Sequence, residues 1–167
     1  MGVSKPGLWI AAAAIVLPSP TAGAEVIYAG TAWAAIDRGA TCEALSRSVR
    51  IAAKGKVQAA VGFSFSGDRR HWGEFHARLR RMPRPGASVM LKVGGQPFLL
   101  VSRGGWAWSR GPQQEQEIIA AARGGGWMQV ETRDQSGGRF SDYYKLDGAA
   151  TAIDAAAARC AGKSVAR

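Results

Sequence analysis

Apolar and polar residues alternate along much of the chain, and this period of two is typical of strands that bury one face. The strands expected in the first half are residues 32–37, 41–48, 57–65 and 74–81. The third of these shows the pattern most clearly, because every odd position from 57 to 65 is apolar. Short strands separated by glycine-rich turns predict a mainly β protein.

A tight hairpin is expected where two apolar segments, 88–93 and 96–102, flank Gly94 and Gly95. Two glycines can adopt the positive φ angles that a two-residue hairpin turn requires. Pro97 has no amide hydrogen to donate to a neighbouring strand. The second strand of this hairpin is therefore expected to begin at a sheet edge or just after a bulge.

Helix and strand patterns are combined in the next part of the chain. Apolar residues at helical spacing predict a helix of two or three turns within residues 110–126, and Gly124 is expected to end it. Residues 126–134 and 139–146 then alternate again on either side of a short polar turn, so a second hairpin is expected there.

The C-terminal segment has helical periodicity. Ile153, Ala156, Ala157 and Cys160 fall at positions i, i+3, i+4 and i+7, on one face of a helix. Asp147 stands at the expected N-cap, where a carboxylate can accept hydrogen bonds from the first free amides. Alanine's small side chain would let this helix lie close to a sheet, with the cysteine pointing inward.

The N-terminal segment has the three parts of a secretory signal peptide. Lys5 supplies a positive charge, an apolar run follows, and Ala22-Gly23-Ala24 has the small residues of a cleavage site. The apolar run is shorter than the about 20 residues that a transmembrane helix needs. We therefore expect residues 1–24 to be removed on export; an uncleaved anchor or a buried helix is the alternative.

Cys42 and Cys160 are expected to form one disulfide, because an exported protein meets an oxidising environment. Two free thiols are the alternative. His71 and His76 do not combine with these cysteines at the spacing of a zinc site, so we expect no metal or cofactor. The sequence thus predicts, for residues 25–167, a single mainly β domain of antiparallel hairpins with a short mid-chain helix and a C-terminal helix tied by the disulfide.

No catalytic constellation is visible in the sequence. No serine near the histidines lies in a G-x-S-x-G turn, and the carboxylates are scattered. On the expected strand 74–81, His76 falls on a polar, arginine-rich face, where we expect it to be solvated. A small hydrolase whose site assembles around His76 through space is the enzymatic alternative.

Arginine is concentrated in residues 68–86, together with Trp72. Arg78 and Arg80 would lie about 7 Å apart on one strand face, and guanidinium groups suit the geometry of phosphate and carboxylate. The alternative is an edge strand that charge protects from aggregation. The residues of the expected anion-binding surface are Arg69, Arg70, Arg78, Arg80, Arg81 and Arg84.

The formal net charge is +10, and it becomes +9 when Lys5 is subtracted with the expected signal peptide. Such a charge favours contact with anions. We expect phospholipid or lipopolysaccharide head groups, acidic polysaccharide or an acidic envelope protein, with nucleic acid an unlikely partner. A solvated basic surface without a partner is the alternative. Trp106 and Trp108 share one side of an extended segment, and an exposed pair would suggest a ligand or membrane contact.

A tryptophan shortly before a cysteine (Trp33, Cys42), central β hairpins and the closing "KLDGAATAIDAAAARC" together resemble the invasion-associated locus B family of exported proteobacterial proteins. That family often ends in an S-L-x-G-F-x-x-A-like helix, of which Leu146, Gly148 and Ala152 match. The family's serine is Lys145 here, its aromatic residue is Ala149, and the additional cysteines of many members are absent. The resemblance implies a β-sandwich of the periplasm or outer membrane, linked in some members to host-cell invasion, with no known catalytic residues.

The function expected from the sequence is that of a non-enzymatic periplasmic or secreted protein of the Gram-negative envelope. It would bind a protein partner or an anionic envelope component through the arginine-rich strand. The alternatives are the hydrolase described above and a structural subunit of an envelope assembly, which an exposed Trp106 and Trp108 patch would favour.

Overall fold

The computed structural model describes residues 1–2 and 23–163, so nearly all of the expected signal peptide, residues 1–24, lies outside the described residues. The described chain contains ten strands and two helices. The strands are β1 (Glu25–Ala29), β2 (Trp33–Asp37), β3 (Thr41–Arg47), β4 (Ala60–Ser66), β5 (Trp72–Arg78), β6 (Val89–Val93), β7 (Gln96–Arg103), β8 (Trp106–Trp108), β9 (Trp127–Arg133) and β10 (Arg139–Lys145). The helices are α1 (Pro112–Arg123) and α2 (Ala149–Ala161).

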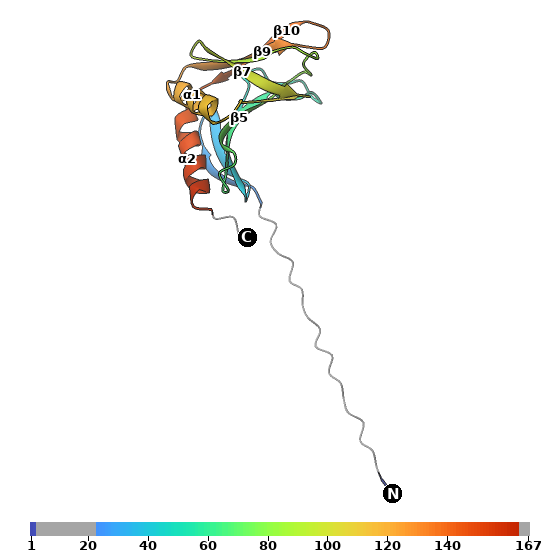
Figure 1. Ribbon diagram of the computed structural model, residues 1–167, viewed down its shortest axis with the longest axis vertical. Coiled ribbons are helices and arrows are strands. Elements are labelled where there is room, and N and C mark those ends of the chain that lie inside the picture. Colours follow the sequence, from blue (N-terminus) through green and yellow to red (C-terminus); the bar gives the residue numbers. More distant parts are fainter. Residues whose placement is uncertain (3–22, 164–167) are drawn as a thin grey trace.

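All ten strands belong to one open antiparallel sheet, in the order β1-β2-β3-β4-β5-β8-β7-β6-β9-β10. Strand β7 joins its two parts, because it pairs with β6 along one edge and with β8 along the other. In Figure 1, β9 and β10 lie across one end of the long strands, and both helices lie on the same side of them. The mainly β, antiparallel class with two helices is confirmed, whereas a two-sheet sandwich is not shown by this continuous pairing.

The hairpin expected around two glycines is confirmed. Gly94 and Gly95 have φ angles of 55° and 89°, in the left-handed region that glycine adopts without strain. Pro97 also lies where the sequence places it, at a free edge, because β8 pairs only with Val101–Arg103 of β7. The missing amide hydrogen of the proline therefore interrupts no ladder.

One strand was not expected from the sequence, and three expectations about element boundaries are corrected by the structure. Strand β1 lacks the alternation that marks the other strands, and its half-exposed pattern gave no signal in the sequence. Strand β4 begins at Ala60 instead of residue 57, and β5 ends at Arg78 instead of residue 81. The N-cap of α2 is Gly148, with a φ of 85° and no side-chain cap, so Asp147 does not have the expected capping role.

Small side chains let α2 lie directly against the first strands of the sheet. Ala152 and Ala156 of the helix are fully buried, as are Ala35 of β2 and Ala44 of β3. The helix contacts β1, β2, β3 and β4. Close approach of this kind is what a helix made mostly of alanine permits, and it brings the C-terminal segment within reach of β3.

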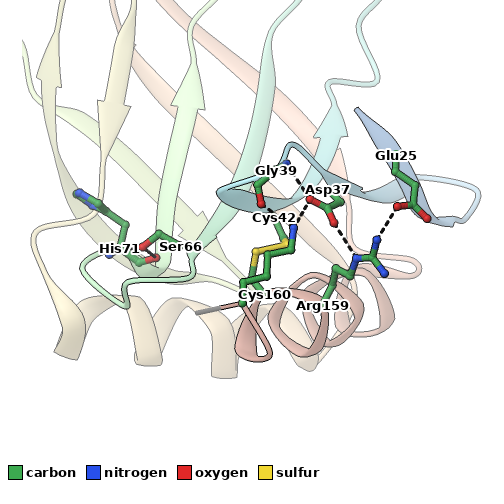
Figure 2. Close-up of a disulfide and its surroundings, with 9 residues drawn as sticks. Glu25, Asp37, Gly39, Cys42, Ser66, His71, Arg159 and Cys160 are labelled. Carbon is green, nitrogen blue, oxygen red and sulfur yellow. Dashed lines mark hydrogen bonds and ion pairs between the residues drawn. A yellow bond between two sulfur atoms is a disulfide. The ribbon is translucent and has the colours of Figure 1, made fainter. Parts of the chain in front are cut away.

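The disulfide expected between Cys42 and Cys160 is confirmed, and it joins β3 to the last turn of α2 with a Cα–Cα distance of 5.8 Å. Both cysteines are fully buried. Figure 2 shows Asp37 beside this bond, where its carboxylate accepts hydrogen bonds from Lys163 and, at 2.7 Å, from Arg159 Nε. A covalent bond and a cluster of ion pairs therefore hold the end of α2 against the adjoining ends of β2 and β3.

The Asp37 cluster should make the protein sensitive to acid. Hydrogen bonds from Lys163 and Arg159 hold the pKa of Asp37 well below its usual range. A lowered pKa stabilises the fold above the unfolded-state value of about 3.9, and this contribution is lost as the pH falls through the folded value. We expect Asp37→Asn to lower the free energy of unfolding by about 1 kcal/mol at pH 7, since both cations stay partly exposed.

Urea unfolding of the oxidised wild type and of Asp37→Asn, measured from pH 7 to pH 2, checks this expectation. The difference between the two proteins should be constant at neutral pH and should shrink below about pH 4. A difference that stays the same over the whole range would show that the charge on Asp37 does not stabilise the fold.

Neither α1 nor α2, the helices of the described residues, is long and apolar enough to span a bilayer.

Candidate functional site

The arginines of the expected anion-binding surface do not lie together. Arg69 and Arg70 belong to the turn between β4 and β5, and they line a groove against α1 that also contains Trp72. The Arg69 guanidinium lies 4.9 Å from the centroid of the Trp72 ring, and Arg70 pairs with Asp68. Arg84 is exposed in the loop before β6, where its amide donates to the carbonyl of Arg133.

Arg78 and Arg80 do not share one strand face, because β5 ends between them. Arg78 is exposed, and its guanidinium lies 5.9 Å from the ring centroid of Trp106. Arg80 turns inward, where its Nε lies 2.7 Å from Oδ1 of Asp142 and its guanidinium 4.9 Å from the Phe140 ring. Burial raises the pKa of Asp142, and the charge of Arg80 opposes this rise.

A pocket of about 610 Å³ brings part of the expected surface together with two further cations. Arg80 and Arg81 line one wall, and Arg50 and Lys56 of the loop between β3 and β4 line the other. Arg81 also forms a 2.8 Å ion pair with Asp134, whereas Arg50 and Lys56 have no ion-pair partner within residues 23–163. We call these four residues the basic pocket.

Gln58 fixes the loop that carries two of these cations. Its side-chain oxygen accepts a hydrogen bond from the amide of Ala52, and its side-chain nitrogen donates to Ser48 Oγ at 2.8 Å and to the carbonyl of Arg50 at 3.0 Å. The amide of Val49 donates to the carbonyl of Tyr143 and so ties the loop to β10. The loop therefore presents Arg50 in a defined place beside Arg80.

Exposed aliphatic side chains are neighbours in sequence of the cations of the basic pocket, and two of them, Ile51 and Val57, line the pocket itself. Ile51 is 79% exposed, and Val49 and Val57 of the same loop and Met82, next to Arg81, are also exposed. Exposed large apolar residues usually mark a contact surface when they gather in one region instead of occurring singly. Here they gather in the two segments that also carry the cations.

His76 is buried rather than solvated as expected, with 9% of its surface exposed. Its Nδ1 lies 3.1 Å from Ser64 Oγ on the neighbouring strand β4, and its ring centroid lies 6.2 Å from that of Trp106. Burial lowers the pKa of His76, although the charges of Glu43 and Glu74 oppose this effect. The imidazole is therefore neutral at pH 7.

The residues around His76 form a hollow of about 300 Å³ on the outer face of the sheet. We call it the tryptophan hollow, and its lining residues are Glu43, Ser64, Glu74, His76, Trp106 and Trp108. The two indole rings are nearly parallel, with an interplanar angle of 18° and centroids 6.4 Å apart. Trp106 is 41% exposed and Trp108 is half-buried, so the pair is open to a ligand on the side of Trp106.

A serine beside a histidine is part of what nucleophilic catalysis requires, but a base also needs a group that orients its second nitrogen. A Cβ atom built on Gly62 would lie 2.7 Å from His76 Nε2, so this nitrogen faces Gly62. Glu43 and Glu74 are engaged elsewhere, by Arg38 and by His71. In this arrangement neither carboxylate is paired with His76 Nε2, and within the described residues no cluster suited to a metal is found.

Comparison of the chain with protein-family models, curated proteins and solved structures finds no match. The resemblance to the invasion-associated locus B family therefore stays a prediction.

Two residues of the basic pocket, Arg50 and Lys56, were not among the site residues expected from the sequence. A signal was present, because four basic residues lie between positions 47 and 56. The sequence pattern does not show that this loop lies beside Arg80, because the two segments come together only when the chain folds. Ser64 was missed for a similar reason, because its contact with His76 depends on the register between β4 and β5.

Proposed function

We propose that the protein is an exported, non-enzymatic envelope protein that binds an anionic phospholipid surface through the basic pocket and the aliphatic side chains around it. The observation that carries this proposal is the coincidence of cations and exposed aliphatic residues in the same two segments. Arg50 and Lys56 lie in one of them with Ile51 between. In the other, Met82 follows Arg81.

Both kinds of side chain are needed to hold a protein at a membrane surface. Basic residues near an anionic leaflet contribute about 1 kcal/mol each and are screened by salt. Apolar side chains that enter the boundary between head groups and acyl chains add a contribution that salt does not screen. Guanidinium groups also suit phosphate oxygens, so Arg50 and Arg81 fit the head group while Ile51 fits the acyl boundary.

Export is supported by two independent features. The N-terminal residues have the order of a signal peptide, and the buried disulfide between Cys42 and Cys160 is of the kind that persists in oxidising compartments. A periplasmic or secreted location, a β-sandwich architecture and membership of the invasion-associated locus B family belong to the same proposal. A hydrolase around His76 and a structural subunit of an envelope assembly remain its alternatives.

Sedimentation with vesicles tests the contact surface. The mature protein should bind phosphatidylglycerol vesicles and should not bind phosphatidylcholine vesicles. Replacing Arg50 and Lys56 with glutamine should weaken binding roughly thirtyfold at low salt, because two contributions of about 1 kcal/mol are lost. Ile51→Ser should weaken binding about tenfold without changing its salt dependence. Arg80 is left intact, because it neutralises the buried Asp142.

The matched control removes the same charge elsewhere. Arg103 and Arg110 are exposed and lie outside the basic pocket, so the Arg103→Gln/Arg110→Gln variant should bind nearly as well as the wild type. If the control weakens binding as much as the pocket variant does, the attraction comes from net charge alone and the pocket is not the site. Tight binding of inorganic phosphate in calorimetry, without vesicle binding, would instead indicate a soluble phosphate ligand.

A further inference from the structure

The tryptophan hollow has no part in the proposed contact with lipid, and it has the composition of a ligand site of its own. Its two nearly parallel indoles come from β8, a strand of only three residues between β5 and β7. Trp106 is the more exposed of the two. Part of its indole is therefore open to solvent, whereas Ala107, between the two tryptophans in sequence, points into the core.

The polar residues of the hollow can both donate and accept hydrogen bonds. Ser64 Oγ lies 3.1 Å from His76 Nδ1, and a hydroxyl group bonded to one partner can still bond a second one. Glu43 and Glu74 add carboxylate oxygens, which accept only. A ligand that offers several hydroxyl groups would find partners of both kinds on this side of the indoles.

Charged groups of both signs lie around the hollow. Glu43 forms an ion pair with Arg38, and Glu74 Oε2 lies 2.7 Å from His71 Nδ1. The guanidinium of Arg78 lies over the ring of Trp106, 5.9 Å from its centroid. A cationic ligand would meet Arg38 and Arg78 beside it, whereas an anionic ligand would meet two carboxylates, so the site suits an uncharged molecule.

The shape of the hollow depends on a residue without a side chain. A Cβ atom at Gly62 would lie 2.7 Å from His76 Nε2 and 2.8 Å from the backbone oxygen of Ala44. Contacts this short are not tolerated, so only glycine leaves room for the imidazole ring between β4 and β8. The ring is thereby held against Ser64 and Trp106, in a place fixed before any ligand arrives.

We propose that the tryptophan hollow binds a neutral saccharide, with a sugar ring against the exposed indole of Trp106 and its hydroxyl groups bonded to Ser64 and Glu74. The C–H groups on the flat side of a pyranose ring carry partial positive charge and suit the negative face of an indole. The volume of about 300 Å³ is at the lower bound of small-molecule sites, enough for one ring of a longer chain.

Titration with defined neutral oligosaccharides tests this site in the full mature chain. Chitotetraose and maltotetraose are added at millimolar concentration while the indole Nε1–H signals are followed by NMR. At least one of them should shift the signals of Trp106 and Trp108. Trp106→Ala should weaken the binding of that sugar about tenfold or more, because the exposed indole supplies the stacking surface. Ser64→Ala should weaken it less, through the loss of one hydrogen bond.

Trp127→Ala is the matched control. Trp127 is also an exposed tryptophan, but it lies on β9 and outside the hollow, so its removal should leave the affinity unchanged. The proposal is overturned if neither sugar shifts the indole signals, if Trp106→Ala binds as well as the wild type, or if choline chloride binds in the hollow while both sugars do not. This site and the lipid-binding surface share no residue, so either can fail without the other.

Discussion

Replacing both Cys42 and Cys160 with alanine should lower the free energy of unfolding by about 2–5 kcal/mol. The disulfide joins residues 118 positions apart, so it restricts nearly the whole unfolded chain from β3 onward. Restriction of the unfolded state is the larger part of this effect, because alanine keeps the small volume that α2 requires against the sheet. Denaturation in guanidinium chloride, followed by circular dichroism, compares the oxidised wild type with the double variant.

The reductant dithiothreitol provides the control for this comparison. It should bring the wild type close to the stability of the double variant and should leave the variant itself unchanged. Amide hydrogen exchange should also show that α2 opens first in the variant, because only the ion pairs of Arg159 and Lys163 still fasten its last turn. A wild type that is equally stable with and without reductant would show that the bond does not stabilise the fold.

Much of the fold could be predicted because its buried faces follow a regular period. Along β4 the core side chains Val61, Phe63 and Phe65 occupy every second position, and along α2 the buried residues Ile153, Ala156 and Cys160 follow the helical repeat. Strand β1 has no buried side chain at all, so it left no pattern in the sequence. Its place is set by pairing with β2 and by the half-buried Ile27 and Tyr28, which pack against the core. The exposed ion pair between Glu25 and Arg159 adds a further contact.

The sites could not be predicted in the same way, because their geometry depends on contacts between distant segments. Strand periodicity alone placed Arg80 on the outer face with Arg78. The chain leaves β5 after Arg78, and the buried Asp142 of β10 then holds Arg80 inside. The orientation of Arg80 thus depends on a buried carboxylate far along the chain, and the residues near Arg80 in the sequence give no sign of that contact.

The burial of His76 also could not be predicted from its neighbours in the sequence. Its polar neighbours in sequence, Arg78 and Glu74, made a solvated face the natural expectation. In the sheet, His76 lies opposite Gly62 on one side and Trp108 on the other. The imidazole is buried because a glycine leaves space for it and a large ring lies beside it. Both neighbours depend on the strand order and the register.

The aromatic cluster in the core is built across four strands. Trp33 of β2 stacks on Phe63 of β4 with a centroid distance of 5.9 Å, and Phe63 meets the edge of Phe75 of β5 at 5.5 Å. The intervening strand β3 carries Ala44 opposite Phe63, so the large rings can meet above it. Trp33 also donates from Nε1 to the carbonyl of Lys145 at the end of β10. The cluster thus connects the two ends of the sheet.

Phe63→Ala should therefore lower the free energy of unfolding by about 3–5 kcal/mol, because it removes the central ring of this cluster and leaves a cavity between Trp33 and Phe75. Urea denaturation of the oxidised proteins measures the effect. Phe63→Leu should cost much less, since most of the volume is kept, and Tyr143→Ala, at an exposed position on β10, should change stability by only about 0.5 kcal/mol. A loss at Phe63 no larger than that at Tyr143 would mean that the rings do not form the packed centre of the fold, and the place assigned to β2, β4 and β5 in the sheet would then be wrong.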